Sequence, residues 1–231
     1  KYNNTLEVNK LREAWSYAQK KYPSLRLRFA WEEELVQVID KIGHVDWRYI
    51  DLSNDTDLTM QKLKVKQIQE GDRCEPYNLA HGNLFRIYLI KHQEASYTCI
   101  FSNHHAILDG WSNPILLEYV HDTYLKLCNR KTVSVLGDHS YEDAQKYLQE
   151  HGEEHKEYWE QYVSRLEERG DLSGLFKKEG GNLRLSDYKH VKCPVEQTLI
   201  IKEKIYESIK SLSQEAGVTL NAVLTYAWHK A

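Results

Sequence analysis

The segment Tyr97-Thr-Cys-Ile-Phe-Ser-Asn-His-His-Ala-Ile-Leu-Asp-Gly-Trp-Ser112 joins a predicted strand to a predicted helix. Residues 97–102 are apolar enough to form a central strand. A long helix is expected after Ser112, with Pro114 in its first turn and apolar residues along one face. The polar residues between the two elements therefore lie at a strand end, where a rigid framework holds side chains at the edge of a cleft.

Two adjacent histidines, His104 and His105, are the chemical groups of this connection. Neighbouring side chains of a strand point to opposite faces, so we expect only one imidazole to face a given site. Imidazole is the usual general base near neutral pH, and Gly110 permits a positive φ or a close approach of the backbone. Two other interpretations stay open: a structural pair bonded to backbone carbonyls, or a metal site at His105 and Asp109. The metal is disfavoured because no third ligand is indicated nearby.

A second clue is the predicted strand Leu25–Phe29. Its three apolar residues share one face, so Arg26 and Arg28 share the other. This polar face is either a solvated edge or a source of one arginine for a buried carboxylate. In the second case Asp109 is the candidate partner, and the pair braces the loop that carries His105.

Alternating helix and strand patterns occupy the rest of the chain and favour a mixed α and β fold. Asn9 is a candidate cap for a first helix that ends before Pro23, and Gly71 is a candidate terminator of a second. The remaining predicted strands are 35–39, 45–50, 84–90 and 197–201, and the remaining predicted helices are 56–70, 141–150, 153–168, 203–216 and one that begins after Thr219.

Composition excludes several classes of protein. Lysine and arginine total 31 against 34 aspartates and glutamates, a net charge of −3, so binding of nucleic acid through bulk positive charge is not expected. No stretch approaches the ~20 apolar residues that span a bilayer. The four cysteines are far apart without a Cys-x-x-Cys pair, which disfavours a disulfide scaffold and makes the cytoplasm the expected compartment.

The stretch His104-His105-Ala-Ile-Leu-Asp109-Gly110 resembles the His-His-x-x-x-Asp-Gly signature of the condensation domains of nonribosomal peptide synthetases, and Trp111-Ser112 continues the resemblance. Other segments resemble this family in the same order, so that the resemblance covers nearly the whole chain: Tyr22–Phe29, Val36–Ile39, Pro76–Leu79 with Gly82–Arg86, Tyr141–Ala144 with Tyr158-Trp159, and Gly217–Leu224. The sequence departs from the family pattern at Tyr22 and Leu27, and Asn78 and Asn83 replace the usual Asp and Pro.

The resemblance implies an α/β fold of the chloramphenicol-acetyltransferase-like type, with a mixed β-sheet flanked by helices. Two such lobes form a V with a tunnel between them. Donor and acceptor peptidyl carrier proteins dock at its ends, with substrates held as thioesters on 4'-phosphopantetheine, and an adenylation domain lies next door. The acceptor amine attacks the donor thioester to form an amide. No metal, directly bound cofactor, nucleic acid or membrane is implied.

The resemblance also assigns roles to residues of this chain. His105 is the active-site histidine, either as general base or as positioner of the amine, and His104 stands beside it in the catalytic motif. Gly110 offers a backbone donor near the oxyanion. Asp109 is structural and paired with Arg26, which we favour, or with Arg28. Trp111 and Ser112 are expected to line the substrate tunnel.

The same resemblance predicts three regions: residues 1–175 as an N-terminal lobe, 176–194 as a linker and 195–231 as the start of a C-terminal lobe. Since the sequence begins at Lys1 without Met and ends at Ala231 inside an apolar helical pattern, we expect a fragment that carries the catalytic histidine and is inactive alone. Two alternatives remain. One is an epimerization domain of the same superfamily, which usually lacks the Trp-Ser continuation. The other is a condensation-like domain that only recruits partners, which commonly lacks the second histidine.

Overall fold

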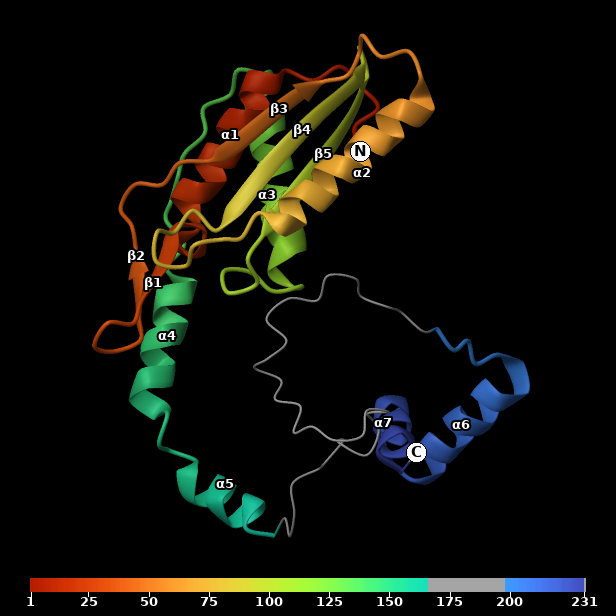
Figure 1. Cartoon of the computed structure of the whole chain (residues 1–231). Helices are drawn as coiled ribbons and strands as arrows, with labels where there is room; N and C mark the ends of the chain where they lie inside the picture. Colours follow the sequence, from red (N-terminus) through yellow and green to blue (C-terminus); the bar gives the residue numbers. More distant parts are fainter. Residues whose placement is uncertain (166–197, 231) are drawn as a thin grey trace, which may run out of the picture. The chain divides into compact units, whose positions relative to one another are not determined.

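The computed structural model describes residues 1–165 and 198–230 (Figure 1). The chain divides into two compact units, Lys1–Arg165 and Leu166–Ala231. The predicted linker 176–194 and the predicted boundary at residue 175 lie outside the described residues.

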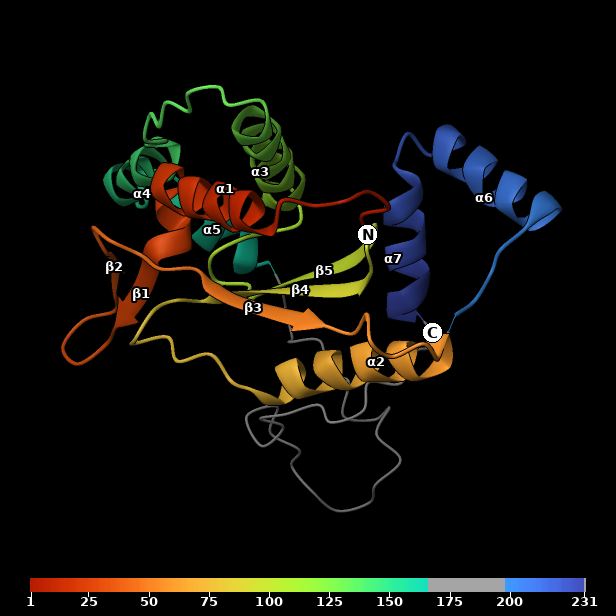
Figure 2. The same cartoon turned by 90° about the horizontal axis from the view of Figure 1, so that it is seen from above.

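A three-stranded mixed sheet forms the centre of the first unit. Strands β3 (Asp46–Asp51) and β4 (Phe85–Gln93) run parallel, and β5 (Ser96–Asn103) pairs antiparallel with β4. Helices α1 (Val8–Lys21) and α3 (Ser112–Cys128) cover one face, and α2 (Leu58–Cys74) covers the other (Figure 2). This arrangement confirms the predicted α/β class with a mixed sheet flanked by helices.

The continuous burial of β4 follows from its position between two layers of helices. Six consecutive residues, Phe85–Ile90, are buried, as is usual for a strand covered on both faces. Phe85, Ile87 and Leu89 join the main hydrophobic core, where Trp15 of α1 packs 6.4 Å from the ring of Phe85 and 5.1 Å from that of Phe101. This aromatic packing fixes α1 against the strand pair that leads to the histidines.

Alternate residues of β4 turn a polar set of side chains toward α2. Arg86 is only 4% exposed and donates to Asp72 Oδ1 at 2.7 Å, while the Tyr88 hydroxyl donates to the same oxygen at 2.9 Å. Ser102 Oγ donates to Asp72 Oδ2 at 2.5 Å and contacts the Tyr77 hydroxyl at 2.8 Å. A buried charge needs such a paired and hydrogen-bonded environment. Asp72 therefore anchors the end of α2 to the sheet.

This anchor explains an error in the helix prediction. Gly71 is not a terminator, because α2 continues through it to Cys74. A glycine costs a helix about 1 kcal/mol relative to alanine, but the hydrogen bonds of Asp72 to Arg86, Tyr88 and Ser102 form only if the helix continues past the glycine. The helix begins after Asp57, whose carboxylate accepts the backbone N–H groups of Thr59 and Met60.

The first helix also differs from its prediction. Asn9 lies inside α1 and does not cap it, because the carbonyl of Glu7 already accepts the N–H groups of Lys10 and Leu11. The helix ends at Lys21, before Pro23 as expected.

A short hairpin follows. The observed strand begins at Leu27, two residues after the predicted start at Leu25. The residues before it, Pro23–Arg26, form a 3₁₀ turn, η1, in which Leu25 N–H donates to the Tyr22 carbonyl. Strand β1 (Leu27–Ala30) then pairs antiparallel with β2 (Val36–Ile39). Arg26 lies in the turn and Arg28 in the strand, so the two do not share a strand face.

The other predicted helices of this unit are present. They are α3, α4 (Ser140–His151) and α5 (Lys156–Val163). Helix α5 starts three residues after the predicted start and ends at Val163, before the predicted end at residue 168.

The second unit contains α6 (Glu203–Glu215) and α7 (Leu220–Lys230), as predicted. The predicted strand 197–201 is wrong over 198–201, where no strand forms. Leu199 and Ile200 are 86% and 68% exposed. A strand requires a hydrogen-bonded neighbour, and none pairs with this segment in the described residues. In the described parts of the chain, no helix is long and apolar enough to cross a membrane.

Asp72→Ala is expected to destabilise the first unit by about 3 kcal/mol, because it removes the nearer carboxylate of the buried Arg86 guanidinium and leaves the more distant Glu75 Oε1, 3.5 Å from Nε. Urea unfolding followed by circular dichroism measures the loss. Glu70→Ala on the same helix is the control, since it breaks only an exposed pair with Lys66. Equal losses for the two variants would contradict the anchoring role.

The same pair predicts a dependence on pH. Burial alone would raise the pKa of Asp72, but hydrogen bonds from Ser102, Arg86 and Tyr88 outweigh it and hold the pKa below the usual value. The stabilisation is then complete above the ordinary pKa of aspartate and lost as the pH falls through the lowered one. The difference in unfolding free energy between the native protein and Asp72→Ala should therefore shrink on acidification.

Candidate active site

The connection from His104 to Trp111 leaves β5 and enters α3. The backbone N–H of His104 donates to the Leu84 carbonyl at 2.9 Å, and Ile107 N–H donates back to the His104 carbonyl at 3.2 Å. Ile107 and Leu108 are buried in the core, only 5% and 8% exposed. Two apolar residues therefore pin the middle of the loop, and the polar residues on either side remain at the surface.

His105 is held by the loop that carries it. Its Nδ1 lies 2.6 Å from the carbonyl oxygen of Leu108. A carbonyl can only accept, so Nδ1 carries the proton. The other ring nitrogen, Nε2, is then the one with a free lone pair in the neutral imidazole, and the side chain is exposed. This arrangement orients His105 as a base or a hydrogen-bond acceptor.

His104 has the opposite arrangement. Its Nδ1 accepts the backbone N–H of Ala106 at 3.1 Å, so the proton of the neutral ring belongs on Nε2. Its ring lies edge-to-face with Tyr77, with centroids 6.2 Å apart, and the Arg86 guanidinium lies 4.0 Å from the centre of the Tyr77 ring. His104 therefore shapes the turn and connects it to the polar set around Asp72.

Asp109 does not pair with either arginine, contrary to the prediction. Its carboxylate accepts the backbone N–H of Ser112 at 2.8 Å and the Ser112 hydroxyl at 2.6 Å. These hydrogen bonds lower its pKa. The residue braces the loop, but it does so by binding Ser112 in the first turn of α3, where free N–H groups attract a carboxylate.

The two arginines have closer acceptors. Arg26 Nε donates to the Gln19 carbonyl at 3.0 Å, and its Nη1 donates to the Asp40 carbonyl. Arg28 Nε pairs with the Asp40 carboxylate at 3.1 Å. Arg26 therefore connects the hairpin to α1, and Arg28 joins the two strands of the hairpin at their end.

Gly110 and Trp111 lie on the open side of the loop. Gly110 does not adopt a positive φ, and a Cβ built on it would meet no atom within 4 Å. Its role as an oxyanion donor stays a prediction. The Trp111 side chain is 86% exposed, and its place in a tunnel likewise stays a prediction.

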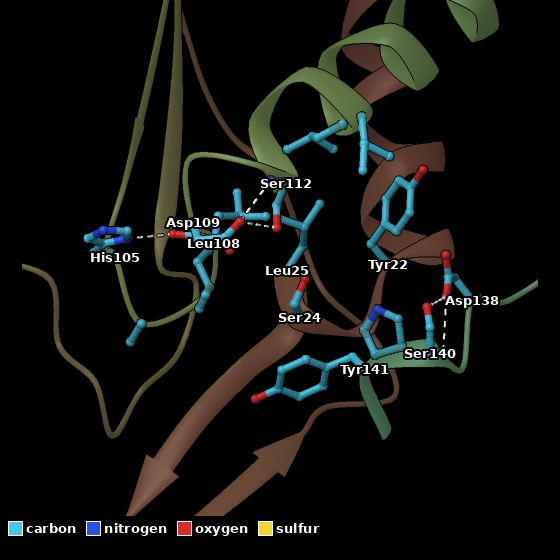
Figure 3. Close-up of a pocket in the computed structure, with 15 residues that line it drawn as sticks. Tyr22, Ser24, Leu25, His105, Leu108, Asp109, Ser112, Asp138, Ser140 and Tyr141 are labelled. Atoms are coloured by element: carbon cyan, nitrogen blue, oxygen red, sulfur yellow. Dashed lines mark hydrogen bonds between the residues drawn. The ribbon is translucent and has the colours of Figure 1, made fainter. Parts of the chain in front are cut away.

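A cavity of about 500 Å³ lies against the loop (Figure 3). Ser112 lines it, but Trp111 does not. Its remaining walls come from the end of α1, η1, the first turns of α3 and the start of α4, and contain Tyr22, Pro23, Ser24, Leu25, His105, Ala106, Ile107, Leu108, Asp109, Ile115, Leu116, Asp138, Ser140 and Tyr141.

Sequence reasoning did not select the far wall of this cavity. Tyr22, Ser24 and Tyr141 lie in segments that resemble the condensation family, and this resemblance is the feature of the sequence that could have identified them as site residues. Asp138 and Ser140 gave no signal, because only the folded chain brings them near the loop. Among the described residues no group of three or more His, Cys, Asp or Glu side chains could hold a metal ion.

Comparison with known proteins identifies the family of this chain. The family model described as Condensation domain matches residues 1–231. The chain is 40% identical over its whole length to N-(5-amino-5-carboxypentanoyl)-L-cysteinyl-D-valine synthase of Amycolatopsis lactamdurans and 36% identical over 99% of its length to the synthase of the same name from Penicillium chrysogenum. It spans only 6% of each of those proteins.

Solved structures show the same fold at low identity. The starter condensation domain of rhizomide synthetase RzmA matches 73% of this chain and 43% of that chain, with a TM-score of 0.60 and 21% identity. The EpoB cyclization-docking bidomain from Sorangium cellulosum matches 71% and 33%, with a TM-score of 0.60 and 19% identity. The chain belongs to the condensation-domain family of nonribosomal peptide synthetases.

The two histidines are expected to be opposite tautomers. At alkaline pH, where imidazole is neutral, His105 should carry its proton on Nδ1 and His104 on Nε2. Imidazole ¹⁵N chemical shifts distinguish the two forms, and assignment uses His105→Gln and His104→Gln. An Nε2-protonated His105 would contradict the hydrogen bond to Leu108.

Double-mutant cycles test the corrected partner of Asp109. Asp109→Ala and Ser112→Ala should be non-additive in thermal unfolding, because both remove the hydrogen bond from the Ser112 hydroxyl to the Asp109 carboxylate. Asp109→Ala and Arg26→Ala should be additive. Coupling in the second cycle and none in the first would restore the arginine pair.

Proposed function

We propose that this chain supplies the catalytic histidine of a peptide-bond-forming condensation reaction between two carrier-bound thioesters. The observation that carries the proposal is the bond from His105 Nδ1–H to the Leu108 carbonyl, which leaves Nε2 unprotonated at an exposed position beside a cavity. Membership of the condensation family indicates the reaction in which His105 would take part.

The reaction needs two bond changes and one proton transfer. The nitrogen of the acceptor amine bonds to the carbonyl carbon of the donor thioester, and the carbon–sulfur bond then breaks. The proton lost by the amine passes through Nε2 of His105 to the departing sulfur, which leaves as a free thiol. An α-amine has a pKa near 8, so much of it is already neutral, and holding two tethered reactants in line supplies a large share of the rate.

The surrounding residues maintain the geometry of the loop. Asp109 holds the loop to the first turn of α3 through Ser112, and the buried side chains of Ile107 and Leu108 fix its middle. His105 thus keeps one orientation before the substrates arrive, which reduces the entropy lost in reaching the transition state.

The substrates follow from the chemistry of the relatives. The synthases with 36–40% identity are named for a product with two amide bonds, one to the cysteinyl and one to the valine residue. We propose that this chain belongs to a module that makes an amide of that kind, with both reactants on 4'-phosphopantetheine arms of peptidyl carrier proteins and with an adenylation domain supplying the acceptor.

His105→Ala in the full-length protein should lower amide formation by about 10²–10⁴-fold, the range typical of a positioned acid–base group. The assay loads both carriers with aminoacyl thioesters and measures the dipeptidyl thioester by mass spectrometry. His121→Ala, on the outer part of α3, is the control and should leave the rate unchanged.

Two results would count against the proposal. Amide formation by His105→Ala at the native rate would remove the histidine from the chemistry. Inversion of the donor α-carbon without amide formation by the native protein would indicate an epimerization domain.

A further inference from the structure

The cavity beside His105 is built from three stretches of the first unit, residues 22–25, 105–116 and 138–141. Tyr22 closes α1, Pro23–Leu25 form η1, and residues 105–109 form the loop. Helix α3 adds Ser112, Ile115 and Leu116, and residues 138–141 add the far wall. At about 500 Å³ it falls in the size range of pockets for small ligands, and it is large enough for any amino-acid side chain.

The lining has an apolar middle and two polar ends. Leu25, Leu108, Ile115 and Leu116 supply the apolar surface. Figure 3 shows Asp109 and Ser112 on one side of the cavity and Tyr22, Asp138 and Ser140 on the other. A ligand that fits such a lining has an aliphatic body and a short polar end.

The charges of the lining have one sign. Asp109 and Asp138 are its two carboxylates, and no lysine or arginine is among the described residues that line it. Each uses Oδ1 to accept from a serine, Ser112 for Asp109 and Ser140 for Asp138, and the other carboxylate oxygen has no partner in the described residues. These serine contacts lower both pKa values, so the carboxylates are ionised at neutral pH. A second carboxylate brought into this space would be repelled.

The cavity lies beside His105, where the two substrates would react. In the proposed reaction the amine and the thioester carbonyl meet at His105, and each belongs to an aminoacyl group whose side chain is one or two bonds away. Because His105 itself lines the cavity, a side chain that branches from either reacting group can enter it.

We propose that this cavity is a specificity pocket for an amino-acid side chain of a carrier-bound substrate. It accepts aliphatic side chains with a neutral or ammonium end and disfavours side chains that end in a carboxylate. The inference rests on the proposed function and extends it from the reacting atoms to the choice of substrate.

Ile115→Trp tests the size of the pocket. Ile115 lines the cavity and is 59% exposed, so an indole can replace it without disturbing the core. The full-length protein is assayed with alanyl and leucyl thioesters, varied first on the donor carrier with a fixed acceptor and then on the acceptor carrier with a fixed donor. We expect the leucyl-to-alanyl ratio of kcat/KM to fall about tenfold or more in one arm, which identifies the substrate that the pocket reads.

Leu125→Trp is the matched control. It places the same side chain on α3 at a 55% exposed position outside the cavity and should leave the ratio unchanged in both arms. If Ile115→Trp fails to fold, Ile115→Ala replaces it. This smaller side chain enlarges the cavity and should raise the ratio for a side chain bulkier than leucine, such as phenylalanine, relative to alanine.

Asp138→Asn tests the charge of the pocket. The amide keeps an oxygen for the Ser140 contact but removes the negative charge. In the arm identified above, the ratio of kcat/KM for lysyl over glutamyl substrate should fall several-fold. An unchanged ratio would overturn the charge preference.

The outcomes separate this proposal from the proposed function. The pocket proposal is wrong and the reaction stands if two results occur together. Turnover of alanyl substrates still depends on His105, and the kcat/KM ratios of the Ile115 variants equal those of the native protein for both donor and acceptor substrates. Loss of the dependence on His105 would overturn the reaction, and the pocket with it.

Discussion

The carbonyl of Leu108 determines the orientation of the site histidine, and it can do so because the Leu108 side chain is buried. A residue that is 8% exposed in the core cannot follow the thermal motion of an exposed loop. Its carbonyl is therefore a fixed acceptor 2.6 Å from His105 Nδ1. The energy that orients the imidazole thus derives from hydrophobic burial three residues away, transmitted by one hydrogen bond.

The sheet supports this loop from both faces. On one face Trp15, Phe85 and Phe101 pack α1 against the strands that precede the loop. On the other, the Asp72 pair with Arg86 holds α2, and Arg86 in turn lies against Tyr77, whose ring touches that of His104. An apolar layer and a polar layer therefore support the loop that carries the two adjacent histidines, while backbone groups of the loop itself, the Leu108 carbonyl and the Ala106 N–H, set their opposite tautomers.

In the proposed reaction, the loop has a second role besides holding His105, because it also lines the cavity. Asp109 has the same kind of contact as Asp138 across the cavity, since each carboxylate binds a serine at the start of a helix, α3 in one case and α4 in the other. Bracing two helix starts in this way also places two negative charges around an apolar space. The residues that stabilise the local fold are then the residues that set the electrostatic preference of the pocket.

The strand–loop–helix order around His105, the α/β class and the family can be predicted from the sequence, because these depend on local periodicity and on a motif of adjacent residues. The partner of Asp109, the continuation of α2 through Gly71 and the walls of the cavity become apparent only in the folded chain. Each of these depends on which groups meet across the fold: Arg26 and Arg28 found nearer acceptors at Gln19 and Asp40, and Asp138 reached the cavity from 29 residues beyond Asp109. A sequence pattern can identify a carboxylate and an arginine as candidate partners, but the fold of the chain sets the distance between them.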